Sequence, residues 1–386
     1  MSDDDPILPL DLYGPELSYF TGKLEAVLRY MELPYRRIGK GPIGDIEKRT
    51  GIAQVPALHL ADGRWLTDST PIIHWLDTRY PDVSVTPRDP VCAFFSRLVE
   101  DYADEWLWRP AMHYRWDYTE SAAHQSRVLA IDDENARDHP LPGFVKRYAI
   151  RTRQRKLFTA GDGVNAETWD HVEKVYLDSL KYLNAIFDQR PYLLGSRPSL
   201  ADFGFFGPMF RHFAMDPTSA RIMRETAPAV FEWVARLWNA KASRSTGEWL
   251  DHVPDDWSPI LDSIGSAYLP HLCANAESWK KQQSRFDVAI EGVPYRQLRT
   301  SRYRVWCLEE LRRHFNELPD SQQPAVRTRL EAHGCWEPLW RVEDPASGIE
   351  LDPKAPPMAG HSAIGLGPGD ADVLYWRPSR PARRTR

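Results

Sequence analysis

Short apolar runs alternate with amphipathic stretches over the first 80 residues, a pattern typical of a small unit of strands and helices. Residues 7–13 are apolar enough for a strand, and apolar side chains recur every three or four positions over residues 24–31. Residues 35–38 predict a second strand. The order strand, helix, strand indicates a βαβ unit.

A β-hairpin and a further helix are predicted next. Apolar residues 54–60 and 65–67 flank an Asp-Gly pair at residues 62–63, which is a strong turn signal. Pro56 fits only near the beginning or the edge of a strand, because proline cannot donate to the hydrogen-bond ladder. Residues 68–71 combine capping side chains with a proline in the first turn, so a helix should begin there.

The pattern then becomes mostly helical. Apolar stripes at helical spacing cover residues 91–118, 169–187 and 230–238. Between the last two stripes, Ser199 and Asp202 stand at capping-box positions and predict a helix start. These features together indicate an all-helical second domain.

A domain boundary is predicted at residues 254–256, and the last third of the chain after it has a different pattern of apolar and polar residues. Most of residues 260–286 and all of 301–318 should be helical, whereas residues 287–293 alternate weakly, like a short strand running into a turn. After Trp340 the chain is rich in Pro and Gly, which is typical of loop and tail. Because four tryptophans need burial, we expect this region to wrap around the helical domain; they are Trp279, Trp306, Trp336 and Trp340.

Composition indicates a folded protein of more than one domain. The chain has 386 residues, of which 42% are hydrophobic and 27% charged, and at about 150 residues per domain this length gives two to three domains. We divide it into a first domain at residues 7–84, a helical domain at 88–252 and a C-terminal extension at 255–386. The arginine-rich end of the extension is interpreted as a disordered basic tail.

Charge and cysteine content narrow the function classes. The net charge of −5 gives the whole chain no electrostatic footprint for nucleic acid. The four cysteines lie far apart, and neither they nor the histidines show metal-binding spacing. The N-terminus is acidic, and no apolar run is long enough to span a bilayer. We therefore expect a reduced, cytoplasmic protein that holds no metal and binds neither membrane nor nucleic acid.

The order of the predicted elements, with five short motifs inside it, resembles the cytosolic glutathione S-transferase (GST) superfamily. The motifs are residues 12–14 together with 18–24, then 54–58, 62–63, 66–69 and 195–202. The resemblance covers roughly residues 7–250 and has no counterpart for residues 255–386. It implies an N-terminal thioredoxin-like βαβ-ββα domain, an all-helical second domain and, beyond them, a mostly helical extension.

The resemblance also implies a glutathione-dependent transferase, a homodimer that activates the glutathione thiol for attack on a small hydrophobic electrophile. Such an enzyme must lower the pKa of a thiol that starts near ~8.5. Serine-type members have a catalytic hydroxyl at the position of Ser18, where the hydroxyl and the helix dipole could both stabilise a thiolate. The alternatives are Tyr13 or Tyr19, since other classes use a tyrosine, or a Ser18 that only caps the helix. Cysteine-type members match poorly, because the N-terminal domain contains no cysteine.

Glutathione itself is implied as the co-substrate. The Val55-Pro56 step resembles the family's cis-proline step, where the backbone before the proline pairs with the cysteinyl part of glutathione. Asp68 and Ser69 match the pair that binds the γ-glutamyl end: the hydroxyl and helix N–H groups suit its carboxylate, and Asp68 suits its ammonium. An ordinary helix cap is the alternative. Two further candidates are Gln54 for the glutathione backbone and Lys40 for the glycyl end.

A hydrophobic substrate pocket would draw on the aromatic-rich segment after residue 100. Its candidates are Tyr102, Trp106, Trp108, Met112, His113 and Trp116. The alternative is that this stripe, at helical spacing, is core packing. A second function class also stays open: a non-catalytic GST-like binding or adaptor protein that kept the fold and uses its extension for interaction.

Overall fold

A four-stranded mixed sheet forms the N-terminal part of the protein. The computed structural model describes residues 5–39, 43–50, 54–132 and 140–349. The strands are β1 (Leu10–Tyr13), β2 (Tyr35–Gly39), β3 (Ala57–His59) and β4 (Trp65–Thr67). They lie in the order β2-β1-β3-β4; β1 and β2 are parallel, and the other neighbours are antiparallel. The predicted βαβ unit and the hairpin after it are therefore confirmed.

Three helices belong to this part of the chain: α1 (Tyr19–Tyr30), α2 (Ile43–Thr50) and α3 (Ser69–Arg79). Ser18 caps α1, since its Oγ accepts the backbone N–H of Thr21 at 3.2 Å. Asp68 caps α3, since its Oδ1 accepts the backbone N–H of Thr70 at 3.2 Å. The φ angle of Asp68 is 73°, a conformation uncommon for a residue with a side chain. Both helix starts lie where the capping residues predicted them.

The second part of the chain is all-helical, as predicted. Its main helices are α4 (Pro90–Glu105), α5 (Trp108–Trp116), α6 (Thr119–Asp132), α8 (Gly143–Gln154), α9 (Trp169–Phe187), α10 (Leu200–Pro208), α11 (Pro217–Thr226) and α12 (Pro228–Trp238). Every residue of α10 is buried. The predicted capping box begins this helix, with the N–H of Ser199 donating to Asp202 Oδ2 at 2.9 Å. Gly204 lets α10 approach α4 closely, because a Cβ there would lie 2.6 Å from the Cα of Glu100.

The C-terminal region packs on the helical part and shares its hydrophobic core. Its elements are α13 (Ser258–Ser263), α14 (Leu269–Lys280), β5 (Arg285–Ile290), β6 (Val293–Arg299), α15 (Arg302–Asn316), α16 (Gln323–Ala332) and α17 (Trp336–Trp340). Phe315 of α15 meets Phe94 of α4 edge-on, with ring centroids 6.1 Å apart. The Tyr268 hydroxyl donates to Asp101 of α4 at 2.6 Å. Trp306 is buried in this core, and the other three tryptophans are partly buried against it.

One element of this region differs from the sequence-based expectation. Residues 287–293 predicted a single short strand, whereas β5 and β6 form an antiparallel hairpin that turns at Glu291 and Gly292. The sequence pattern did not predict the second strand because the strand contains a proline and several exposed polar side chains. These residues obscure the alternation of apolar and polar positions that is typical of a strand. The basic tail predicted at the C-terminus lies outside the described residues.

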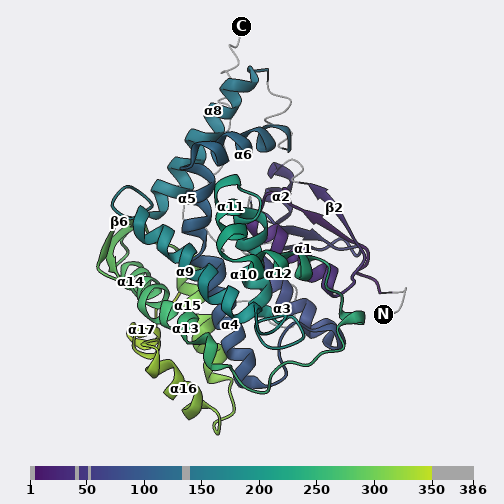
Figure 1. The fold of residues 1–386 in the computed structure, drawn as a ribbon, viewed down its shortest axis with the longest axis vertical. Coiled ribbons are helices and arrows are strands. Elements are labelled where there is room, and N and C mark those ends of the chain that lie inside the picture. Colours follow the sequence, from purple (N-terminus) through teal and green to yellow (C-terminus); the bar gives the residue numbers. More distant parts are fainter. Residues whose placement is uncertain (1–4, 40–42, 51–53, 133–139, 350–386) are drawn as a thin grey trace.

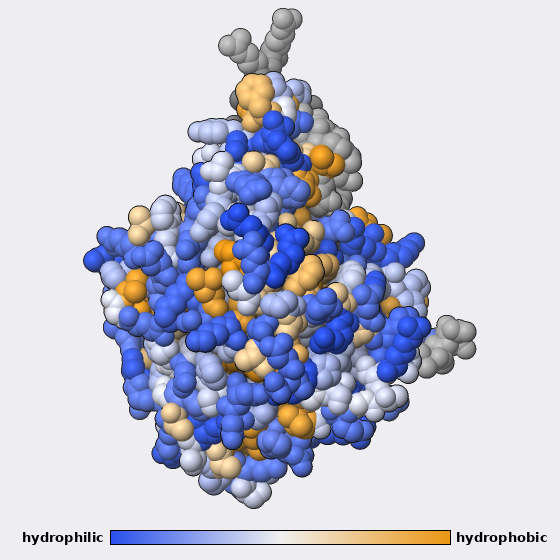
Figure 2. Space-filling view, in the orientation of Figure 1, coloured by the Kyte–Doolittle hydropathy of each residue, from blue (hydrophilic) through white to orange (hydrophobic). Residues whose placement is uncertain are grey.

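Figure 1 shows the sheet on one side of the helical part, the C-terminal helices α13 to α17 at its lower end, and α6 and α8 projecting as an arm. The surface is mostly hydrophilic, with scattered apolar spots (Figure 2). Among the large apolar side chains that are exposed, Leu141, Phe144 and Tyr148 lie on this arm or next to it. Within the described residues, no helix is both long and apolar enough to cross a membrane. The predicted fold class is confirmed.

Candidate functional site

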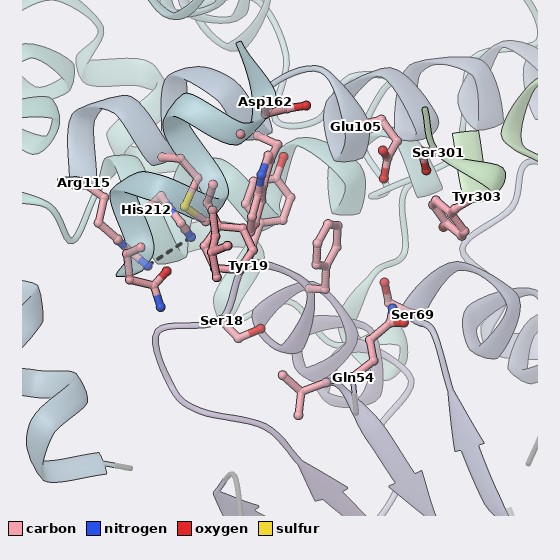
Figure 3. A pocket seen from close by; sticks show the side chains of 18 of the residues that line it. Ser18, Tyr19, Gln54, Ser69, Glu105, Arg115, Asp162, His212, Ser301 and Tyr303 are labelled. Atoms are coloured by element: carbon pink, nitrogen blue, oxygen red, sulfur yellow. Dashed lines mark hydrogen bonds between the residues drawn. The ribbon is translucent and has the colours of Figure 1, made fainter. Parts of the chain in front are cut away.

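A cavity of about 460 Å³ lies where three parts of the chain meet (Figure 3). The sheet unit contributes the start of α1, the residues before β3 and the start of α3. The helical part contributes α5 and the segment around residue 158, and the C-terminal region contributes residues 299–304. The cavity therefore brings together most of the glutathione-site residues predicted from the sequence, namely Ser18, Tyr19, Gln54, Val55, Pro56, Asp68 and Ser69.

Of the three candidate hydroxyls, only that of Ser18 both belongs to a cavity-lining residue and donates no hydrogen bond among the described residues. Its Oγ accepts the Thr21 N–H, a bond that does not use the hydroxyl proton. The Tyr19 hydroxyl instead donates to the backbone carbonyl of Ala103. Burial raises the pKa of Tyr19 well above its ordinary value, so the phenol keeps its proton. Tyr13 does not line the cavity and packs against the Trp65 ring at 4.9 Å.

Asp68 and Ser69 are both buried at the cavity wall. Asp68 Oδ1 is held by the Thr70 N–H, but its buried Oδ2 has no hydrogen-bond partner among the described residues. Burial raises the pKa of Asp68 to about 6, although the Thr70 N–H, the charge of Lys23 and the nearby Tyr303 hydroxyl oppose the rise. Within the described part of the chain, the Tyr303 hydroxyl is thus the one side-chain donor near this carboxylate, and the Oδ2 atom can still accept a hydrogen bond from a group in the cavity.

Gln54 and Val55 also line the cavity, directly before β3, and Gln54 lies close to Ser69 (Figure 3). The Val55-Pro56 peptide bond is cis, as the family resemblance implied. Lys40, the candidate for the glycyl end, lies outside the described residues.

The apolar side of the cavity is built mainly from α5. Trp108 and Met112 lie on the face of this helix that points into the cavity, together with Trp116. The Trp108 ring stacks on Phe20 of α1, with centroids 5.8 Å apart, and meets Phe158 edge-on at 5.6 Å. These rings form an aromatic chamber beside Ser18.

The structure places three of the predicted pocket residues away from the cavity. Tyr102, Trp106 and His113 are buried in the interior, and the cavity-lining members of the stripe are those spaced by four residues along α5. The Tyr102 hydroxyl lies 2.9 Å from Ser263 Oγ. Trp106 packs under the Arg109 guanidinium at 4.6 Å. His113 lies between carboxylates, 2.8 Å from Asp117 and 3.0 Å from Glu173.

A buried arginine supports the loop that carries Ser18, and sequence reasoning missed it. Arg115 Nη1 donates to the carbonyl of Leu17 at 3.0 Å, and its Nε donates to Asp216 at 2.9 Å. Burial and the Arg115 charge hold the pKa of His212 well below its usual range, so the neutral ring can accept from Arg115 at 3.1 Å (Figure 3). No local motif marks Arg115, because its partners lie about 100 residues away in both directions.

The wall formed by residues 299–304 was also missed. Sequence resemblance offered no counterpart for this region, and the one local signal was the Ser301 helix cap. Arg304 in this wall bridges Glu105 at 3.1 Å and Asp162 at 3.0 Å. Four buried cysteines are unpaired, and none lines the cavity. Among the described residues there is no group of His, Cys, Asp and Glu arranged to hold a metal.

Comparison with known protein families finds matches in the sheet unit and in the helical part. Residues 17–79 match the family model "Glutathione S-transferase, N-terminal domain", and residues 166–236 match "Glutathione S-transferase, C-terminal domain". Comparison with curated protein sequences finds no match.

Several solved structures are similar to the chain. The β-etherase LigF from Sphingobium sp. strain SYK-6 is 23% identical, over 59% of this chain and 94% of its own, with a TM-score of 0.42. A glutathione S-transferase from Rhodospirillum rubrum F11 is 18% identical over 64% and 99%, with a TM-score of 0.40. One from Methylobacterium radiotolerans, in complex with glutathione sulfonate, is 17% identical over 64% and 98%, with a TM-score of 0.37.

The two domain matches occur in the order in which the thioredoxin-like sheet unit and the helical part follow one another in the structure. Neither match reaches the region after residue 236, which includes the wall at residues 299–304. Both domain models match in sequence order, so the regions at residues 17–79 and 166–236 are those of glutathione S-transferase N- and C-terminal domains.

Proposed function

We propose that this protein is a glutathione-dependent transferase that activates the glutathione thiol for attack on a hydrophobic electrophile. The observation that carries the proposal is the buried, unpartnered Oδ2 of Asp68 beside Ser69, in the same cavity as Ser18. The ammonium of a γ-glutamyl group would satisfy this carboxylate oxygen. The Ser69 hydroxyl and the Ser69 N–H would bind the neighbouring carboxylate, since the Thr70 N–H is held by Asp68 and Pro71 has no N–H.

Ser18 is the proposed thiolate-stabilising residue. Its hydroxyl can accept from the Thr21 N–H and donate its own proton to the sulfur at the same time. The N-terminus of α1 adds a partial positive charge near the same point. Each unit by which the thiol pKa falls requires about 1.4 kcal/mol of preferential thiolate stabilisation, which one charge-assisted hydrogen bond can supply.

The aromatic chamber of Phe20, Trp108 and Phe158 would hold the electrophile next to the sulfur. A homodimer and a cytoplasmic location stay predictions of the family resemblance, and sedimentation velocity would test the first of them.

Replacing Ser69 with alanine should weaken glutathione binding about tenfold, because one charge-assisted hydrogen bond to the γ-glutamyl carboxylate is lost. Isothermal titration calorimetry with reduced glutathione measures the change. Thr78→Ala is the matched control, since Thr78 is an exposed hydroxyl residue on the same helix. If the wild type releases no heat with glutathione, the proposed function is wrong. Binding with an unshifted thiol pKa would favour the non-catalytic binding protein.

Glutathione affinity should fall as the pH decreases from 7 to 5. Binding of an ammonium favours ionised Asp68, so a proton competes with glutathione once the pH passes below the Asp68 pKa of about 6. One unit below that pKa the expected loss is about tenfold. Calorimetry across this range measures it, with Asp68→Asn as the comparison: that variant should bind more weakly at pH 7 and lose the pH dependence. A pH dependence unchanged in Asp68→Asn would assign the titration to another group.

A further inference from the structure

The wall formed by residues 299–304 is a fixed part of the cavity. It joins β6 to α15, and α14 holds it from behind through Asn275. The Asn275 side chain donates to the Ser301 carbonyl at 2.9 Å and accepts the Ser301 N–H at 2.8 Å. Thr300 is bound to Ser278 of α14 through their hydroxyls, 2.7 Å apart. Groups on this wall are therefore pre-organised toward the cavity.

The wall carries three arginines that differ in their partners. Arg304 is neutralised by Glu105 and Asp162. Arg302 donates to the backbone carbonyls of Ser347 and Gly348, at 2.5 and 2.7 Å. Arg299 also lines the cavity, but among the described residues no carboxylate lies within ion-pair distance of it.

The Arg299 guanidinium lies close to Gly161. A Cβ on Gly161 would lie 3.0 Å from Arg299 Nη2 and 3.1 Å from the carbonyl of Lys156. Gly161 itself lines the cavity beside Asp162. The guanidinium therefore lies against the backbone of the turn Ala160–Asp162, and Arg299 is partly buried.

The arginines around this turn differ in their ion pairs. Asp162 accepts from Arg109 at 3.2 Å and from Arg304 at 3.0 Å. Burial would raise the pKa of Asp162, but the charges of Arg109, Arg304 and Arg299 hold it below its ordinary value. Glu105 is the second carboxylate beside this turn, and it pairs with Arg304. Arg109 and Arg304 are thus paired with these two carboxylates, whereas Arg299 forms an ion pair with neither among the described residues.

An apolar chamber separates this guanidinium from the start of α1. Trp108 stands between Phe20 of α1 and Phe158, and Phe158 precedes the turn that carries Gly161 and Asp162. A ligand that fills the cavity would therefore meet a planar apolar environment in its middle and a guanidinium at the far wall. A ligand with a flat aromatic ring and one carboxylate would match both features, with the ring among the aromatic side chains and the carboxylate at the guanidinium.

We propose that Arg299 forms an anion subsite that selects aromatic electrophiles bearing a carboxylate. The pairing is the bidentate contact in which two N–H groups of a guanidinium bind the two oxygens of a carboxylate. The cavity by itself supports the binding of such a carboxylate. Its reaction with the glutathione thiol rests on the proposed function. The subsite belongs to the C-terminal region that both domain matches leave uncovered.

A binding experiment without glutathione tests the subsite independently of turnover. The probes are 4-methyl-3-nitrobenzoate, which has no halide leaving group, and the corresponding neutral amide. The signal is quenching of tryptophan fluorescence, to which Trp108 and Trp116 in the cavity contribute. The wild type should bind the carboxylate about tenfold more tightly than the amide. Arg299→Gln should remove this preference and leave the amide affinity unchanged, and Arg299→Lys should retain part of it. Equal wild-type affinities for the two probes would overturn the inference.

Arg296→Gln is the matched control. Arg296 lies on the same strand, is exposed, pairs with Glu167 and does not line the cavity. It should keep the carboxylate preference of the wild type. A similar loss in both variants would show a general charge effect of the hairpin and would contradict a specific subsite.

Turnover then separates this inference from the proposed function. With 4-chloro-3-nitrobenzoate, the glutathione sulfur forms a C–S bond to the ring carbon, the C–Cl bond breaks, chloride leaves with the electron pair, and the thiol proton passes to solvent. Arg299→Gln should lower kcat/KM for this electrophile about tenfold, with no change for the chloro-nitrobenzamide or in the KM for glutathione. A higher KM for glutathione instead would place its glycyl carboxylate at Arg299 and overturn the inference. Carboxylate-selective binding without turnover would support the subsite and contradict the transferase.

Discussion

Replacing Ser18 with alanine should lower turnover at neutral pH roughly 10- to 100-fold. The hydroxyl that donates to the sulfur is lost, and a charge-assisted hydrogen bond of this kind is worth about 1.5–3 kcal/mol, or one to two pKa units of the thiol. The thiolate absorbance of bound glutathione, titrated with pH, measures the pKa directly. At higher pH the glutathione thiol of the variant also ionises, so the loss of activity should become smaller as the pH is raised.

The pH profile distinguishes this role from that of a helix cap. Ser18→Ala also removes the bond to the Thr21 N–H, which should cost about 1 kcal/mol of stability without moving the thiol pKa. Ser18→Thr keeps a hydroxyl and should retain most of the activity. Tyr19→Phe is the matched control, since the Tyr19 hydroxyl donates to the Ala103 carbonyl. A thiol pKa that rises in Tyr19→Phe and not in Ser18→Ala would assign the role to Tyr19.

Replacing Lys23 with methionine should lower the free energy of unfolding by about 3–5 kcal/mol. Lys23 of α1 is fully buried and donates to Glu100 and Asp104 of α4 and, at 3.1 Å, to Thr70 of α3. Burial alone would lower the pKa of Lys23, but the charges of Asp104 and Glu100 more than offset it and raise the pKa above its ordinary value. Without the ammonium, two buried carboxylates would face each other unpaired.

Urea unfolding followed by circular dichroism measures this change. Lys174→Met is the control, because Lys174 is exposed and its pair with Asp178 is worth about 0.5 kcal/mol or less. Burial already raises the pKa of Asp104 in the wild type, and loss of the Lys23 charge should raise it further in Lys23→Met, so the folded state would bind more protons than the unfolded state. The destabilisation should then shrink as the pH is lowered. Equal effects of the two substitutions would contradict a central role for Lys23 at the junction of the sheet unit and the helical part.

The local elements of the site were predictable because each rests on a pattern only a few residues long. The helix starts near Ser18 and within residues 68–71 were identified from capping side chains next to an apolar periodic run, and in the structure Ser18 and Asp68 cap the two helices. The Ser199–Asp202 capping box was predicted in the same way. The role of these residues toward glutathione came from the resemblance and stays a proposal.

Sequence patterns did not distinguish the residues that line the pocket from those that pack in the core. Tyr102, Trp106 and Met112 share one aromatic-rich stretch, yet of these three only Met112 lines the cavity. Helical spacing of apolar residues predicts that one face of the helix is buried, but that face can pack in the core or line a cavity. The orientation of α5 toward Phe20 and Phe158 decides between them.

By itself, then, the sequence determined the βαβ-ββα unit, the helical domain after it and the caps that begin α1, α3 and α10, because hydrophobic period and capping chemistry act over one or two turns of chain. Only the tertiary structure decided that the wall at residues 299–304 closes a cavity that begins at Ser18. That residues nearly 300 positions apart line one cavity depends on how the packed helices and the hairpin are placed, and no local spacing encodes that placement.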